Sequence, residues 1–402
     1  MPMKYPKNKI KDRKEALQAT PGDTPWGVFG GGLYSASGPK HTMVSLFSGC
    51  GGVDLGFHFA GFKTLWANDI NEDAAATFKK NLGDITVGDI TKTALPNIKE
   101  KVDVLVAGFP CQPFSNAGSR LGLSDTRGTL FQDALRAVDH FEPKVVVFEN
   151  VRGLLSFKTS KKPLVQVICD KLAALGYRPS FKLVDASDYR VGQRRLRLLI
   201  VGVSERLGEG FAFPQPRTKD ELSIGQMLKG IKASSNNQAE RIALNPQAVA
   251  LGAFVPEGGS WKDIPDSELP PRLKKLRKDI KRYRWPNFYR RFHRDEVAGT
   301  VTAAFKPENA GVWHPVTGDV MSVREIARIQ SFPDWFVFEG KTVKSKYQQI
   351  GNAVPPRLAY EVALCVKRTL AGAAVQAVEP ITFKSFLELG RPFRPADPAV
   401  AF

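Results

Sequence analysis

The sequence predicts an α/β fold with a mostly parallel sheet, together with a small loop-rich domain. Between residues 42 and 205, short apolar runs alternate with amphipathic stretches, the pattern of parallel strands joined by crossover helices. The runs are apolar on both faces, as strands buried between two layers of helices should be. The expected strands are 42–47, 63–68, 102–107, 144–149, 180–185 and 196–203. The expected helices are 53–60, 71–81, 129–141 and 163–175.

The composition changes after this region. Prolines, glycines and polar runs interrupt residues 206–296, which predicts a second domain with few long elements. Ordered patterning returns with the strand-like run 297–304 and with expected helices near 322–331 and 356–371.

Positive charge is concentrated in one segment of the second domain. The 402-residue chain carries 58 Lys and Arg against 40 Asp and Glu, a net charge of +18 that favours a polyanionic partner. Residues 271–294 hold eleven of these basic residues and a single acid, Asp279. Aromatic residues are interleaved with them, which suits phosphate contacts combined with base stacking. The alternative is the solvated face of a basic soluble protein.

The chain ends and the cysteines limit the remaining classes. Residues 1–40 form a basic arm and residues 373–402 a Pro-containing tail, both without periodicity, and we expect both to be flexible. The cysteines lie far apart, which argues against a disulfide framework or a metal site. No apolar run reaches the roughly 20 residues that cross a bilayer, and the N-terminus lacks a signal-peptide core. We therefore expect a soluble, cytoplasmic protein with no membrane contact.

Three predicted strands end in residues suited to a nucleoside ligand. Glycines in 47–52 (FSGCGG) allow a close backbone approach, and the following helix offers free N–H groups. Asp69 ends the second strand, where a carboxylate usually holds ribose hydroxyls, and Asp89 ends the third. An ordinary tight turn is the alternative for the glycine loop. GCGG departs from the dinucleotide fingerprint, and no phosphate-binding lysine motif is present.

Cys111 follows the apolar run 102–107 within GFPCQPFS. Pro110 stiffens the turn, and ligand sites in parallel sheets lie at the carboxyl ends of strands. A small buried cysteine is the alternative for this residue alone.

Together these segments resemble, in order, the motif series of the DNA (cytosine-5)-methyltransferases of bacterial restriction–modification systems. The resemblance covers roughly 42–205 and 297–370, and it leaves a variable target-recognition region between them. The matching segments are SLFSGCGGVDLGF (45–57), WANDINEDA (66–74), VGDI (87–90), PCQ (110–112), ENV (149–151), GQRRLRLLIVG (192–202), VREIARIQSFP (323–333) and QQIGNAVPP (348–356).

The resemblance implies covalent catalysis on a flipped cytosine. Cys111 would add to C6, and Glu149 would donate a proton to N3. Asn150 would orient the cysteine loop, while Arg195 and Arg197 would hold the base and order the centre. From the residues alone, Glu149 could be a capping or salt-bridged acid, and the two arginines a surface pair.

The resemblance also implies S-adenosyl-L-methionine as methyl donor and a Rossmann-like domain made of 41–205 and 297–372. Its last motif is expected to fold back beside the first. The implied cofactor-binding residues are Phe47, Gly49, Gly51, Gly52, Asp69, Ile70, Asp89, Ile90, Leu130, Asn352 and Val354.

Double-stranded DNA is the expected partner of a monomeric enzyme, and a cognate restriction endonuclease that acts separately is the other candidate partner. Loop 115–128 is expected to close on DNA, with Ser115, Arg120 and Arg127 in contact. Expected phosphate contacts are Lys274, Lys275 and Arg277, and expected base contacts are Arg290, Arg291 and Arg294. The alternatives are an RNA cytosine-5 methyltransferase, a catalytically inactive DNA-binding relative and a NAD-type oxidoreductase.

Overall fold

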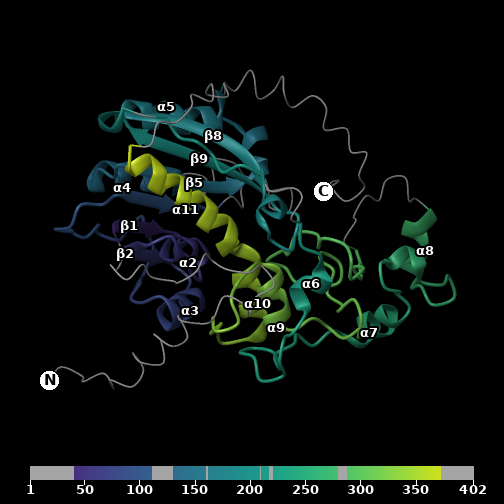
Figure 1. Ribbon diagram of the computed structural model, residues 1–402. Helices are drawn as coiled ribbons and strands as arrows, with labels where there is room; N and C mark the ends of the chain where they lie inside the picture. The colour runs from purple at the N-terminus through teal and green to yellow at the C-terminus, as the bar shows by residue number, and fades with distance from the viewer. Residues whose placement is uncertain are drawn as a thin grey trace.

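A computed structural model of the protein describes residues 40–110, 130–159, 162–208, 210–216, 221–278 and 288–372. A seven-stranded sheet forms its centre, in the order β3-β2-β1-β4-β5-β9-β8 (Figure 1). The strands are β1 (His41–Leu46), β2 (Phe62–Asp69), β3 (Thr86–Val87), β4 (Val104–Ala107), β5 (Val145–Val151), β8 (Tyr177–Asp185) and β9 (Leu196–Ser204). A separate hairpin pairs β6 (Lys158–Thr159) with β7 (Lys162–Pro163).

The sheet is parallel except at one strand. The pairs from β3 to β5 are all parallel, whereas β9 runs antiparallel to both β5 and β8. The sheet is therefore mostly parallel, as expected, with β9 as its antiparallel strand. Residues 186–195 join β8 to β9, and a connection this short leaves no room for the crossover that parallel neighbours need.

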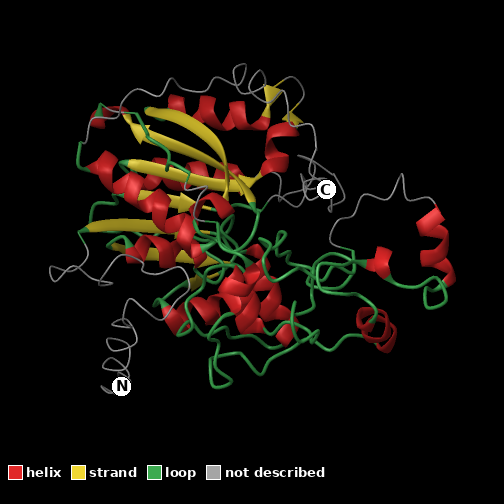
Figure 2. Cartoon of the chain, turned by 45° about the vertical axis from the view of Figure 1, so that its right-hand side comes forward, coloured by secondary structure: helices red, strands yellow, loops and turns green. Residues whose placement is uncertain are grey.

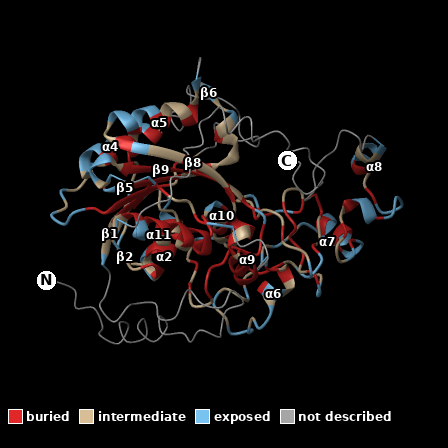
Figure 3. Ribbon diagram, turned by 45° about the horizontal axis from the view of Figure 1, so that its top comes forward, coloured by how far each residue is buried: buried red, intermediate tan, exposed pale blue. Residues whose placement is uncertain are grey.

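Helices cover both faces of the sheet, as Figure 2 shows. Val44 and Leu46 of β1 pack in one core with α4 (Leu130–Phe141) and α5 (Leu164–Ala174). Met43, on the opposite face of the same strand, packs in another core with α2 (Gly52–Phe59) and α11 (Pro356–Leu370). This alternation explains the apolar character of the strands on both faces, and Figure 3 shows the sheet buried between the helices.

The second part of the molecule is built mainly from loops around an aromatic core. Trp261, Phe332 and Tyr347 are buried in one cluster, which also includes Leu55 and Phe59 of α2. The run 297–304 was expected to be a strand, but it makes only an isolated bridge between Ala298 and Gln193. The domain boundaries near 205 and 297 stay predictions. The helices beyond the sheet are α3 (Glu72–Asn81), α6 (Ile224–Leu228), α7 (Pro246–Ala253), α8 (Pro271–Lys278), α9 (Val323–Ile329) and α10 (Val343–Asn352).

The C-terminal helix returns to the start of the fold. A Cβ built on Gly56 of α2 would lie 2.5 Å from the carbonyl oxygen of Pro356 and 2.6 Å from Cβ of Ala359. Only glycine therefore lets α11 come this close to α2. Among the described helices, none is long and apolar enough to cross a membrane.

Candidate active site

The glycine loop between β1 and α2 bends back against the end of β2. Phe47 and Gly49 have positive φ values of 54° and 55°, so the chain makes a sharp turn there. The Gly49 N–H donates to Oδ2 of Asp69 at 2.7 Å, and the Asn71 N–H donates to Oδ1 at 2.8 Å. Burial raises the pKa of Asp69, while hydrogen bonds from the backbone of Asn71, Gly49 and Ile70 lower it. The carboxylate is thereby fixed beside the loop.

Each glycine of this loop meets a different environment. A Cβ on Gly51 would lie 2.3 Å from Cδ1 of Leu82, and one on Gly52 would lie 2.3 Å from the Val354 carbonyl oxygen. A Cβ on Gly49 would meet nothing within 4 Å. The protein therefore packs tightly behind the loop and leaves space over Gly49. The contact at Gly52 also brings Val354, from the far end of the sequence, to the expected position.

Other predicted cofactor residues lie at the neighbouring strand ends. Ile70 is 68% exposed, an unusual state for a large aliphatic side chain, directly after Asp69. Asp89 accepts from N and Oγ1 of Thr91 at 3.0 and 2.8 Å, and the Thr91 hydrogen bonds lower its pKa. Ile90 is buried in the same core against which Leu130 packs. Asn352 is exposed at the end of α10.

The predicted catalytic acid borders the backbone that leads to Cys111. A Cβ on Gly108 would lie 3.4 Å from Oε2 of Glu149. The buried Asn150 donates from Nδ2 to the Phe109 carbonyl at 3.2 Å. Pro110 is the last described residue of this segment. Four predicted site residues lie outside the described part of the chain, as do the arm and the tail: Cys111, Ser115, Arg120 and Arg127.

Glu149 forms a largely buried ion pair with Arg197. Nε of Arg197 lies 2.7 Å from Oε1 of Glu149, and the two side chains are 11% and 13% exposed. Burial raises the pKa of Glu149, and the charges of Arg197 and Arg195 oppose that shift. A carboxyl with a raised pKa can hold a proton closer to neutral pH, as a proton donor to a base requires.

Arg195 has a different position from Arg197. Its guanidinium is buried and donates to the carbonyls of Val301 at 2.8 Å, Gly351 at 2.7 Å and Ala353 at 3.1 Å. These bonds tie the start of β9 to two distant segments. Of the two predicted arginines, Arg197 thus contacts Glu149 and Arg195 binds the surrounding backbone.

The basic residues of α8 fall into two groups. Lys274 and Lys275 are exposed. Arg277 turns inward, where Nη1 binds Oδ1 of Asp266 at 2.7 Å and the guanidinium lies over the Trp261 ring. The three arginines expected to read bases are also bound by other groups of the protein. They bind acids or backbone carbonyls of neighbouring loops: Arg290 to Glu296, Arg291 to Pro315 and Val316, and Arg294 to Glu257. Their guanidinium groups are therefore less available to DNA than the sequence pattern indicates.

Sequence reasoning missed a buried carboxyl beneath the glycine loop between β1 and α2. Asp54 of α2 is 1% exposed and accepts hydrogen bonds from Ser45 at 2.9 Å and Thr64 at 3.3 Å. Burial raises its pKa to about 7. The available signal was an acid in the run GVDLGF, on a helix that must lie against a sheet.

Comparison with known proteins gives one family. The C-5 cytosine-specific DNA methylase family matches residues 41–368. The chain is 38% identical over 342 residues to the Type II methyltransferase M.NgoFVII of Neisseria gonorrhoeae, covering 82% of this chain and 87% of that protein. It is 36% identical over 352 residues to the Type II methyltransferase M.Eco47II of Escherichia coli, covering 82% and 79%. A mutant of Spodoptera frugiperda DNMT2 shares the fold, with a TM-score of 0.56 and 18% identity over 82% of this chain and 100% of that chain. The chain belongs to the C-5 cytosine-specific DNA methylase family.

Proposed function

We propose that this DNA cytosine-5 methyltransferase modifies cytosine within a specific double-stranded sequence, through a covalent intermediate on Cys111. The observation that carries the proposal is the Glu149–Arg197 pair, with an N–O distance of 2.7 Å, beside the backbone that leads to Cys111. A cysteine, a carboxyl of raised pKa and an arginine are the groups that this reaction requires. The hydrogen bond from Asn150 to Phe109 fixes the entry to the cysteine loop.

The proposed reaction begins at C6 of the base. The thiolate of Cys111 forms a C–S bond to C6, and a proton from Glu149 to N3 stabilises the electron pair displaced into the ring. C5 thereby becomes nucleophilic and takes up the methyl group. Loss of the C5 proton to a base, departure of the thiolate and return of the N3 proton to Glu149 restore the aromatic ring. The target base must leave the duplex to reach these groups.

The loop residues fit S-adenosyl-L-methionine, which supplies an electrophilic methyl group when bound. The space over Gly49 admits a ligand next to the backbone. Asp69 retains acceptor capacity for ribose hydroxyls on its two oxygens, and the exposed side chain of Ile70 offers an apolar face to adenine. Asp89 supplies a second carboxylate at the end of β3.

The charge of the protein and the names of its relatives support DNA as the substrate. The net charge of +18 and the exposed lysines of α8 suit a polyanion. The two relatives described above are named Type II methyltransferases, which supports membership of a restriction–modification system with a separate endonuclease.

Bisulfite sequencing of plasmid from cells that express the protein tests the activity and gives its target sequence. We expect Cys111→Ala to lose methylation completely, since the three cysteines that the structure describes, Cys50, Cys169 and Cys365, are all buried. Cys169→Ala is the matched control, because Cys169 is buried in α5 within the core between that helix and the sheet. Methylation by purified Cys111→Ala at a rate near that of the control would refute the covalent mechanism.

A duplex with 5-fluorocytosine at the target tests the same mechanism independently. Fluorine blocks loss of the C5 substituent, so the enzyme should stay bound through denaturation when S-adenosyl-L-methionine is present. Normal turnover on unmodified DNA without such a complex would contradict the scheme. Transcribed RNA of the same sequence, used in parallel, tests the RNA alternative.

A further inference from the structure

Three buried polar side chains meet where the start of β9, the end of α9 and the end of α10 come together. We name Gln193, Arg195 and Gln330 the buried junction. Gln193 and Gln330 are 0% exposed and Arg195 is 1% exposed. Buried amides and guanidinium groups are costly unless they are hydrogen-bonded, so their partners show what the junction holds in place.

The side chains of the buried junction bind one another and the backbone of two segments. Nε2 of Gln193 donates to Oε1 of Gln330. Both backbone polar groups of Val301 are taken: its N–H donates to Oε1 of Gln193 at 3.0 Å, and its carbonyl accepts from Arg195 at 2.8 Å. The Ala353 carbonyl accepts from Gln330 at 2.6 Å and from Arg195 at 3.1 Å.

One of these segments reaches the cofactor loop. Ala353 and Val354 lie against Gly52, where an added Cβ would come within 3.2 Å of Cβ of Ala353. Gln330 also donates to the carbonyl of Ile350 at 3.1 Å, within the last turn of α10. A shift of the cofactor loop would therefore move the carbonyl of Ala353, to which both Gln330 and Arg195 donate.

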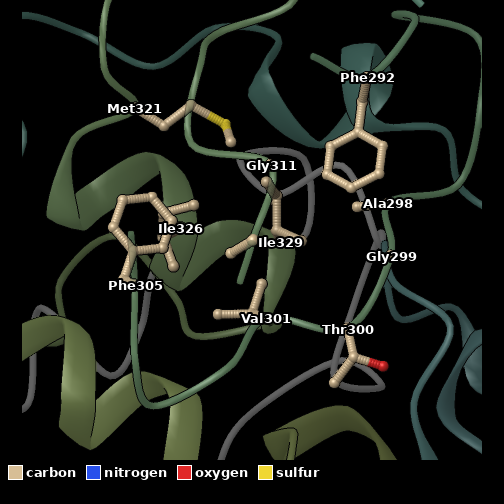
Figure 4. Close-up of a pocket in the computed structure, with 11 residues that line it drawn as sticks. Phe292, Ala298, Gly299, Thr300, Val301, Phe305, Gly311, Met321, Ile326 and Ile329 are labelled. Atoms are coloured by element: carbon tan, nitrogen blue, oxygen red, sulfur yellow. The ribbon is translucent and has the colours of Figure 1, made fainter. Parts of the chain in front are cut away.

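The other segment belongs to the second part of the molecule. The side chain of Val301 lines a small apolar pocket with Phe292, Phe305 and Ile329 (Figure 4). Its backbone, on the other hand, is bound by the buried junction. Thr300 donates to the carbonyl of Arg194 at 2.7 Å, which joins the same segment to the strand that carries Arg197.

The buried junction thus connects the cofactor loop, the segment around Val301 and the strand that carries Arg197. Its hydrogen bonds allow these three parts few alternative arrangements. Arg197, two residues after Arg195, pairs with the catalytic acid Glu149. Of the side-chain nitrogens and oxygens of the buried junction, only Nε of Arg195 has no hydrogen-bond partner among the described residues. The network tolerates little distortion, because any other donor or acceptor that is displaced loses its partner where no solvent replaces it. Movement of the cofactor loop, of Val301 or of the arginine strand should then displace the other two.

We propose that Gln330 is a positioning residue that, through Gln193 and Arg195, couples the cofactor loop to the Glu149–Arg197 pair, where the target base would bind. The proposal rests on the proposed function. Binding of DNA and binding of the cofactor would each strengthen the other by the same factor, as thermodynamic linkage requires. Gln330 itself touches neither ligand.

The test compares the affinity for S-adenosylhomocysteine, by calorimetry, with and without a saturating duplex that carries the target found by bisulfite sequencing. For the unmodified protein we expect the duplex to tighten binding by about 5-fold or more. Gln330→Met keeps the size of the side chain and removes its amide, and should reduce this ratio to near one.

Gln349→Met is the matched control. Gln349 is also buried and its amide binds Thr77 and Glu339, but it makes no contact with the buried junction among the described hydrogen bonds. We expect it to keep the coupling ratio even if it lowers the melting temperature as much. A loss of coupling in both variants would mark a general loss of stability and overturn the proposal.

Gln193→Met covers the case in which Gln330→Met does not fold. It should lose the coupling as well, and the double variant should lose no more than either single one, because each single substitution already breaks the bond that joins the two side chains. An unmodified protein that methylates DNA but shows no coupling, or a Gln330→Met variant that retains it, would refute the inference alone. Failure of the unmodified protein to methylate DNA would instead refute the proposed function.

Discussion

At the scale of single residues, the charge state of a buried acid depends on how many groups bind it. Glu149 faces Arg197 in an ion pair. Asp54, which is also buried, is bound only by the hydroxyls of Ser45 and Thr64 among the hydrogen bonds of its side chain. Two hydroxyl donors do not compensate for the loss of water around a full charge. The pKa of Asp54 therefore rises to about 7, and the acid keeps its proton when the unfolded chain has already lost it.

The raised pKa of Asp54 predicts how the stability of the folded protein changes with pH. Between about pH 4, the ordinary range of an aspartate, and about pH 7, the folded state holds a proton that the unfolded state releases. Unfolding is favoured as pH rises through this window, by roughly 1.4 kcal/mol per pH unit. Asp54→Asn removes the titrating group. We compare the free energy of unfolding of the two proteins in urea at pH 5 and at pH 8. Relative to the unmodified protein, the variant should be more stable at pH 8 than at pH 5, by on the order of a few kcal/mol.

Asp170→Asn provides the control for this experiment. Asp170 is on the exposed side of α5, and hydrogen bonds from Gln166 and Lys162 lower its pKa. It is ionised in both states from pH 5 to pH 8, so its removal should change stability by the same amount at both values. If Asp54→Asn also changed stability by the same amount at pH 5 and pH 8, Asp54 would be ionised in the folded protein.

At the scale of elements, a glycine allows α2 and α11 to pack closely together. Gly56 lies within α2, and an exposed helical glycine replaced by alanine normally gains about 1 kcal/mol from helix propensity. Here the added Cβ would lie 2.5 Å from the Pro356 oxygen and 2.6 Å from the backbone nitrogen of Tyr360. Because both are backbone atoms, the two helices would have to separate.

Gly56→Ala should therefore destabilise the protein, by about 1–3 kcal/mol as in other overpacked cores. Thermal unfolding gives the sign directly, since propensity and packing predict opposite effects. Gly210→Ala is the control, because a Cβ there would meet nothing within 4 Å. A Gly56→Ala variant as stable as the unmodified protein would show that α11 is free to move away from α2.

The elements also show what the sequence could predict. The strands and helices of the first domain lie within a few residues of their expected positions, because their apolar periodicity comes from burial on both sheet faces. The direction of β9 depended on the length of a connection. The run 297–304 is apolar because Ala298 and Val301 are buried in the aromatic core, while Arg195 and Gln193 bind only its backbone. The periodicity of apolar residues indicates that a segment is buried, but not which part of the molecule covers it. For the same reason, Arg277 and Arg290 looked like DNA contacts although acids of the same protein bind them.

At the scale of the whole molecule, some basic side chains bind groups of the protein itself, whereas others are exposed to an external polyanion. The arginines of the second part mostly bind acids and carbonyls nearby, whereas Lys274, Lys275 and Lys278 are exposed on α8. This helix stands apart from the sheet, at the right-hand edge of Figure 1. Exposed lysines on a protruding helix, with no ion pair to any acid that the structure describes, are suited to neutralising phosphates at a distance from the catalytic centre.

Replacing Lys274, Lys275 and Lys278 together with glutamine tests this division. Each phosphate contact contributes about 0.9 to the slope of log affinity against log salt, so the slope should fall by up to about 2.7. Binding should weaken on all DNA sequences equally and the methylated sequence should stay the same, because phosphate contacts carry no base information. Arg277→Gln is the contrasting variant: it breaks the contacts to Asp266 and Trp261, and should lower stability while leaving the slope nearly unchanged. If the triple variant retained the full slope, α8 would be a solvated face, and the DNA charge would have to be met elsewhere on the protein.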